Sequence, residues 1–103
     1  MVDPAVFRLL QEITGVAFSM DASCNPNGTN SLCARYATPD EFCKTDVAGE
    51  ALWCCASPTD VRQFQQHYQR CKSSNPNNTC AVFVVPKSHH LKQYFSQLGY
   101  KLV

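Results

Sequence analysis

The cysteines have the widest chemical range of any residue type in this 103-residue sequence. None of them has the Cys-x-x-Cys spacing that presets two corners of a tetrahedral zinc site, so we expect no metal. Their odd number and the lack of a secretory signal argue against a disulfide framework. We predict reduced, mostly buried thiols, with a cysteine-rich metal-binding module as the alternative. The seven are Cys24, Cys33, Cys43, Cys54, Cys55, Cys71 and Cys80.

Two adjacent cysteines, Cys54 and Cys55, could form a redox pair or supply a nucleophile. A nucleophilic thiol needs a lowered pKa, and Cys55 precedes Ser57-Pro58, where a helix N-terminus would favour the thiolate. His67 is poorly placed as its base, because it lies at the far end of the same predicted helix. The apolar run around the pair is more typical of buried strand thiols, which is the interpretation we favour.

Basic residues near the end of the chain form a mild cluster around two adjacent histidines. The net charge of +1 is too small to predict nucleic-acid or membrane binding by electrostatics alone. We expect a solvated surface here, with phosphate binding as the alternative, and at most weak binding of DNA. The cluster comprises Lys87, His89, His90, Lys92 and Lys101.

Apolar runs are short throughout the sequence. None approaches the roughly 20 residues needed to cross a bilayer, so no membrane partner is expected. The first residues include Asp3 and Pro4 and no long apolar run, unlike a secretory signal. We therefore expect one intracellular domain over residues 1–103, either cytoplasmic or nuclear.

The first half of the chain predicts a helix, a strand and a short helix. Asp3-Pro4 marks the start of the first helix and Gly15 its end. A short strand is predicted over residues 16–22, followed by a loop over residues 23–37. Thr38-Pro39-Asp40-Glu41 is a capping box that opens a short helix. The expected apolar stripe of the first helix comprises Val6, Leu9, Leu10 and Ile13.

The second half predicts strands over residues 51–56 and 80–85, both apolar runs typical of strands covered on two faces. Between them, Ser57-Pro58-Thr59-Asp60 predicts a helix start. Ser88 is predicted to cap a last helix, and residues 100–103 are predicted to form a final short strand. The apolar sides of these two helices comprise Val61, Phe64, Tyr68 and Cys71, and Leu91, Tyr94, Phe95 and Leu98.

This alternation of helices and strands predicts an α/β fold. We expect a small, mainly parallel, Rossmann-like sheet of about four strands with helices on both faces. Ligands of such sheets bind at the carboxyl ends of the strands. Three segments fall at that edge, namely Asp21 with the loop after it, Cys55-Ala56-Ser57-Pro58, and Pro86-Lys87-Ser88.

Motifs along the chain follow one another in the order seen in one enzyme family. The chain resembles phage-type DNA adenine methyltransferases, in the form carried by some retroelement polyproteins. That family has Asp-Ala, then Cys-x-Arg-Tyr, then Trp-x-Asn-Pro-Pro-Tyr/Phe, then a strand ending in Val-Pro. It also extends past the position of Val103, so we expect a unit truncated at its C-terminus. The matching segments are Asp3-Pro4-x-x-Phe7-x-x-Leu10, Phe18-Ser19-Met20-Asp21-Ala22, Cys33-Ala34-Arg35-Tyr36, Leu52-Trp53-Cys54, His67-Tyr68 and Val84-Val85-Pro86.

The chain departs from that family at the catalytic motif. With Trp53 aligned, Asn-Pro-Pro-Tyr falls on Cys55, Ala56, Ser57 and Pro58. The family's Asn and a backbone carbonyl accept hydrogen bonds from the adenine amino group, and the aromatic ring stacks on the flipped base. A thiol is a poor acceptor and proline has no aromatic ring, so the resemblance implies a catalytic site that is degenerate and inactive.

The resemblance also implies a cofactor site and a substrate pocket. It places Asp21 and Ala22 where S-adenosylmethionine binds, and a carboxylate there could accept from the donor's amino group or a ribose hydroxyl. A turn-capping role for Asp21 is the open alternative. It places Trp53, Arg35 and Tyr36 around the substrate. The alternative for Trp53 is a position in the core, and the alternative for Arg35 and Tyr36 is packing over the edge of the sheet.

Taken together, the sequence favours a degenerate, inactive methyltransferase-like domain of retroelement origin. Its partners would be other segments of a polyprotein and, weakly, DNA. The alternatives are an active S-adenosylmethionine-dependent DNA adenine methyltransferase and a cysteine-rich metal-binding or interaction module.

Overall fold

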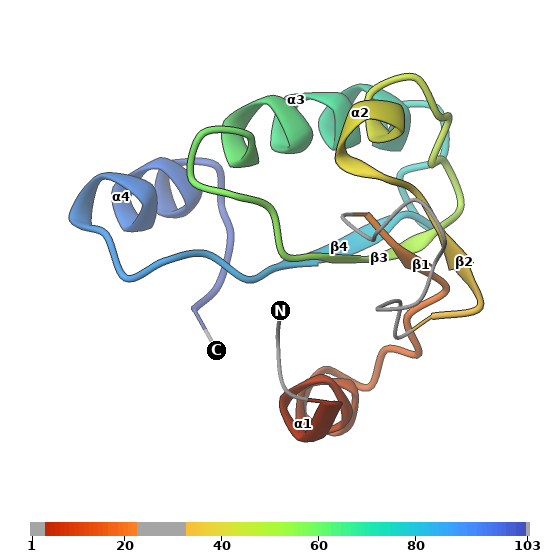
Figure 1. Cartoon of the computed structure of the whole chain (residues 1–103), viewed down its shortest axis with the longest axis horizontal. Helices are drawn as coiled ribbons and strands as arrows, with labels where there is room; N and C mark the ends of the chain where they lie inside the picture. The colour runs from red at the N-terminus through yellow and green to blue at the C-terminus, as the bar shows by residue number, and fades with distance from the viewer. Residues whose placement is uncertain (1–3, 23–32, 103) are drawn as a thin grey trace.

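The computed structural model describes residues 4–22 and 33–102, and Asp3, Cys24 and Val103 lie outside these ranges. Within them, helices and strands alternate along the chain, with two strands in succession between the first and second helices (Figure 1). The elements are α1 (Pro4–Thr14), β1 (Met20–Asp21), β2 (Arg35–Tyr36), α2 (Pro39–Phe42), β3 (Ala51–Cys54), α3 (Val61–Lys72), β4 (Cys80–Phe83) and α4 (His89–Gln97).

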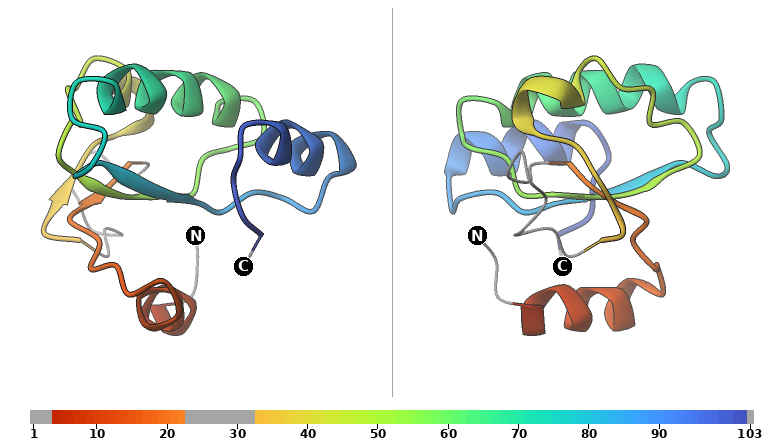
Figure 2. Two further views of the ribbon diagram at one scale, coloured as in Figure 1. Left: turned by 180° about the vertical axis from the view of Figure 1, so that it is seen from behind. Right: turned by 45° about the vertical axis from the view of Figure 1, so that its right-hand side comes forward.

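The four strands form one parallel sheet in the order β2-β1-β3-β4. In the register, Asp21 lies opposite Tyr36 on one side and Trp53 on the other. Helix α1 covers one face of the sheet, and α2 and α3 cover the other (Figures 1 and 2). The predicted α/β fold, with a parallel Rossmann-like sheet of four strands and helices on both faces, is confirmed.

Side chains of β3 alternate between two hydrophobic cores, one on each face of the sheet. Leu52 and Cys54 point into the larger core, beneath α3, and each is 0 % exposed. Trp53 points the other way, into a smaller core that it forms with Phe7 of α1 and Phe18. A strand buried on both faces must be apolar at every position, which explains the continuous run seen in the sequence.

Helix α1 is turned relative to its predicted apolar stripe. Phe7 is its buried residue and Leu10 packs partly against the core, whereas Val6, Leu9 and Ile13 are 41–57 % exposed. The predicted stripe was therefore wrong for three of its four residues. The cause is the Phe7 ring, which lies 5.0 Å from Trp53 and 5.4 Å from Phe18 between ring centroids. Phe7, Phe18 and Trp53 form a cluster of three rings in mutual contact, and such aromatic pairs stabilise a core beyond the area that they bury.

Several predictions about strands need correction. The strands predicted over residues 51–56 and 80–85 end earlier, at Cys54 and Phe83. The predicted strand over residues 16–22 is reduced to β1, although a bond from the Ala22 amide to the Trp53 carbonyl (2.9 Å) extends its pairing. Strand β2 lies inside the predicted loop over residues 23–37. Residues 100–102 form no strand, because Gly99 has φ +87° and the Tyr100 amide bonds back to the Phe95 carbonyl (3.1 Å).

The predicted helix caps hold for α2 and α4 but not for α3. Glu41 Oε1 accepts from the Thr38 amide (3.4 Å) and hydroxyl (2.8 Å), and Ser88 Oγ accepts from the Leu91 amide (3.4 Å). Helix α3 begins at Val61 with Asp60 as its N-cap, rather than at Ser57. Residues 57–60 form a preceding turn, closed by the Ser57 hydroxyl on Asp60 Oδ2 (2.9 Å).

Candidate functional site

The order of the strands in the sheet reverses between β1 and β3. From β1 the connection leads outward to β2 on one side, and the next strand, β3, returns to the other side of β1. The two outgoing connections therefore separate at this point, which is where open parallel sheets bind ligands. The residues at this switch point are Asp21 and Ala22 after β1, and Cys55 and Ala56 after β3.

Asp21 is a buried carboxylate at the centre of this edge. The residue is 5 % exposed, and its carbonyl accepts from the Ala37 amide at 2.8 Å. Its charge contributes to raising the pKa of the thiols of both Cys33 and Cys55. A buried carboxylate is costly unless polar groups surround it, so the position is more demanding than that of an ordinary surface aspartate.

The thiols around Asp21 are protonated at neutral pH. Burial, with a further contribution from the Asp21 charge, raises the pKa of Cys33 to about 11. Burial and Asp21 also raise the pKa of Cys55, and burial raises the pKa of Cys54 strongly. A nucleophilic cysteine needs a lowered pKa, whereas the pKa values of these thiols are raised. The shifts therefore favour unreactive thiols.

Residues 55–58, where the resemblance predicts a catalytic motif, follow β3 at the same edge as Asp21. Cys55 is half-buried, and Ala56 is 7 % exposed and packs in the larger core. Ser57 and Pro58 are exposed, and the Ser57 hydroxyl is bonded within its own turn to Asp60. At these four positions the chain therefore offers no side-chain amide and no aromatic ring to the edge.

The three residues predicted to surround the substrate are not brought together. Trp53 is 2 % exposed and is a core residue beneath α1, with Phe7 edge-on to its ring. Tyr36 ends the outer strand β2 opposite Asp21, and at 42 % exposed it lies at the rim of the edge. Arg35 makes an ion pair with Glu50, at the opposite end of the sheet.

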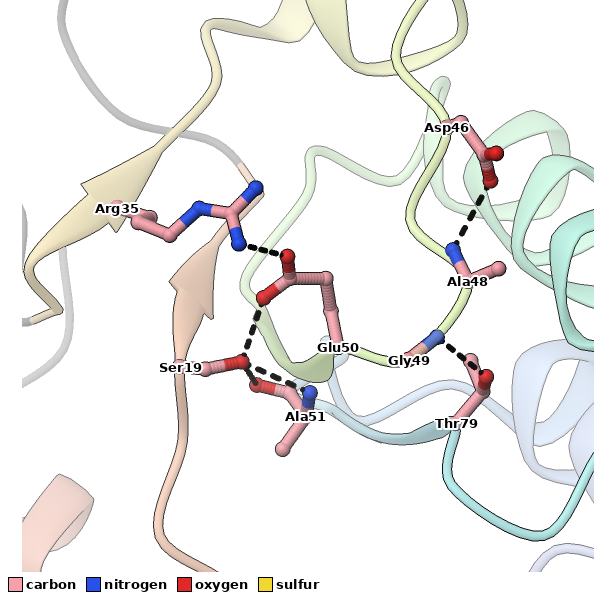
Figure 3. Close-up of polar contacts among 8 residues, drawn as sticks. All are labelled: Ser19, Arg35, Asp46, Ala48, Gly49, Glu50, Ala51 and Thr79. Carbon is pink, nitrogen blue, oxygen red and sulfur yellow. Dashed lines mark hydrogen bonds and ion pairs between the residues drawn. The ribbon is translucent and has the colours of Figure 1, made fainter. Parts of the chain in front are cut away.

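A polar network that the sequence analysis missed ties the amino ends of three strands together (Figure 3). Glu50 accepts from the Ser19 hydroxyl at 2.7 Å and pairs with the Arg35 guanidinium. Ser19 Oγ in turn accepts from the Ala51 amide at 2.9 Å. Ser19 and Glu50 each immediately precede a strand, which was the available signal. Arg35 therefore has a structural role in this network, through its ion pair with Glu50.

We expect Glu50→Ala to lower the free energy of unfolding by about 1–3 kcal/mol, since it removes a buried hydrogen-bonded charge. Asp46 is the matched control, because its exposed carboxylate accepts one bond, from the Ala48 amide at 3.0 Å (Figure 3). Asp46→Ala should cost less than about 1 kcal/mol. Urea denaturation checks both values, and equal losses would contradict the structural role of Glu50.

Other candidate groups lie away from the switch point. His67 is buried in α3, with Nε2 2.6 Å from the Thr45 carbonyl and 3.5 Å from Cys71 Sγ, which is a structural arrangement. No three or more histidine, cysteine or acidic residues of the described ranges are placed to hold a metal ion. Two open hollows of the described surface lie at the end of α1 and between α3 and α4. They contain none of the predicted site residues.

Within residues 4–22 and 33–102, no helix has both the length and the apolar character needed to span a membrane. Comparison with known proteins found no match to the chain among family models, curated proteins or solved structures.

Proposed function

We propose that the chain is a degenerate methyltransferase-like domain of retroelement origin that keeps a pocket for the methyl donor and does not transfer the methyl group. The observation that carries the proposal is the position of Asp21, a buried carboxylate at the carboxyl end of β1, beside the switch point of a parallel sheet. This is where nucleotide-type ligands bind in such folds. The motif resemblance is independent support.

Asp21 has the chemistry to recognise the adenosyl part of S-adenosylmethionine. An ionised carboxylate only accepts hydrogen bonds, and it has about four lone-pair sites on two oxygens. Ribose hydroxyls and the donor's ammonium group are hydrogen-bond donors that match it. Ala22 is 0 % exposed and its amide is bonded to the Trp53 carbonyl, so the backbone beside Asp21 is held in place.

The methyl-transfer step lacks its usual groups. A base amino group must be oriented by an amide oxygen and a ring, and positions 55–58 provide a protonated thiol, a buried methyl group, a hydroxyl and a proline. Losing pre-organised groups of this kind commonly costs several kcal/mol of transition-state stabilisation. Binding of the donor needs none of these four side chains, so donor binding and transfer separate in this chain.

Calorimetric titration with S-adenosylmethionine tests donor binding. We expect saturable heat for the wild type and at least a tenfold weaker affinity for Asp21→Asn, equivalent to about 1.4 kcal/mol. Asp46→Asn is the matched control, since Asp46 is an exposed aspartate in the loop before β3 whose carboxylate accepts from the Ala48 amide, and it should bind as the wild type does. Absence of heat from the folded wild type would refute the donor pocket.

A radiolabel transfer assay on adenine-containing duplex DNA tests the second half of the proposal. We expect no transfer above background under conditions that saturate the donor site. Turnover would overturn the assignment as a degenerate enzyme and establish an active methyltransferase. Near-stoichiometric zinc in the purified protein would instead favour the metal-binding module.

A further inference from the structure

Helix α1 carries an apolar stripe that the domain does not cover. Val6, Leu9 and Ile13 are 41 %, 52 % and 57 % exposed. Phe7 and Leu10, on the adjoining side of the helix, make its contacts with the smaller core. No other described helix lies beside α1 on its face of the sheet (Figure 2). The helix therefore has two apolar sides, of which one is buried in the domain and the other is open.

The spacing of the exposed stripe is that of a helix-pairing seam. Val6, Leu9 and Ile13 are separated by three and then four residues, as are successive core positions of a coiled coil. Residues with this spacing form one ridge along a helix surface. Single exposed apolar side chains are ordinary, whereas three on one ridge of an 11-residue helix are typical of an interaction surface.

Two opposite charges lie on one flank of this stripe. Arg8 and Glu12 are exposed, are one helical turn apart and line the same open hollow at the end of α1. Neither makes an ion pair with another described residue. If two copies of α1 pack antiparallel about a twofold axis, Arg8 of each copy comes opposite Glu12 of the other. The same arrangement brings Val6 opposite Ile13, and Leu9 close to the axis.

We infer that α1 is a self-association surface, on which the α1 helix of a second copy of this chain packs antiparallel. The occupant is a second copy because the apolar ridge and the flanking charges are both self-complementary in this orientation. Parallel packing would instead set each charge level with its like. A helix of this length offers less than the roughly 800 Å² per partner of a standard interface, so the dimer is weak and reversible.

Analytical ultracentrifugation of the whole chain over a range of concentrations tests the inference. We expect a monomer–dimer equilibrium with a dissociation constant between about 10 and 500 µM. Leu9→Gln should weaken it about tenfold or more, because both copies lose an apolar side chain at the centre of the contact. Leu98→Gln is the matched control, since Leu98 is 48 % exposed at the end of α4, and it should associate as the wild type does. Circular dichroism checks that both variants are folded.

Reversing the charges tests the orientation of the two helices. Arg8→Glu and Glu12→Arg should each weaken the dimer about tenfold, because each turns two attractive contacts into two repulsive ones. Combining the two substitutions exchanges the charges between the positions and should restore the affinity of the wild type. Single variants that associate as strongly as the wild type would exclude antiparallel packing.

A wild type that stays monomeric at about 1 mM would overturn the inference. Equal effects of Leu9→Gln and Leu98→Gln would do the same, as would a double charge variant that does not regain affinity. Binding of a monomeric wild type to phosphatidylcholine vesicles, lost in Leu9→Gln, would assign the stripe to a lipid surface instead. Asp21→Asn should dimerise like the wild type, so this inference and the donor pocket can fail separately.

Discussion

Replacing Trp53 by alanine is expected to lower the free energy of unfolding by about 3–5 kcal/mol. The indole is 2 % exposed and forms the centre of the core beneath α1 with Phe7 and Phe18, at 5.0 and 5.4 Å between ring centroids. Small domains are stable by roughly 5–15 kcal/mol, so the variant should be largely unfolded at moderate urea concentrations. Urea denaturation followed by circular dichroism measures the loss.

Tyr36→Ala is the control for this change, because Tyr36 is 42 % exposed on the outer strand β2. An exposed substitution of this kind should cost less than about 1 kcal/mol. A loss below about 1.5 kcal/mol for Trp53→Ala would mean that α1 does not pack on the sheet as described.

The second large effect is a loss of stability in alkaline solution. Burial raises the pKa of Cys54 strongly, and burial raises the pKa of Tyr68 and of Tyr100 to about 12. Unfolding returns these groups to ordinary values near 8.5 for a thiol and 10 for a phenol. Between the unfolded and folded values, unfolding releases protons, so the free energy of unfolding falls as the pH rises. Below about pH 8 these groups contribute no pH dependence.

Cys54 alone should account for about 2 kcal/mol of this loss between roughly pH 8 and 10, since it is fully buried. Urea denaturation at several pH values measures the dependence. Cys54→Ala should weaken the domain at neutral pH but remove about that amount from the pH dependence. Identical pH dependence in the wild type and the variant would contradict the burial of this thiol.

Sequence patterns predicted the fold class because its two long strands leave little ambiguity. The apolar runs over residues 51–56 and 80–85, separated by the amphipathic α3, favour a parallel sheet covered on both faces. Strand β2 could not be predicted, because two residues carry no periodicity. The face of α1 was missed because Phe7 lies outside the stripe of aliphatic residues, and only the packing against Trp53 decides between them.

The candidate site was predictable where topology alone positions it. Residues that follow parallel strands meet at one edge, so Asp21 and Cys55 were expected together and lie together. Arg35 and Trp53 depend on side-chain direction, which alternates along a strand and cannot be assigned without the register. The ion pair to Glu50 was hidden because it joins residues from separate elements.

We propose that the edge around Asp21 holds a nucleoside-type methyl donor. The most direct test is a ¹H–¹⁵N correlation spectrum of the labelled protein during titration with S-adenosylmethionine. We expect saturable shift changes concentrated at the amides of Ala22, Ala37 and Ala56, and no such changes in Asp21→Asn. A wild-type spectrum that stays unchanged at millimolar donor, or changes confined to α1 or α4, would contradict the claim.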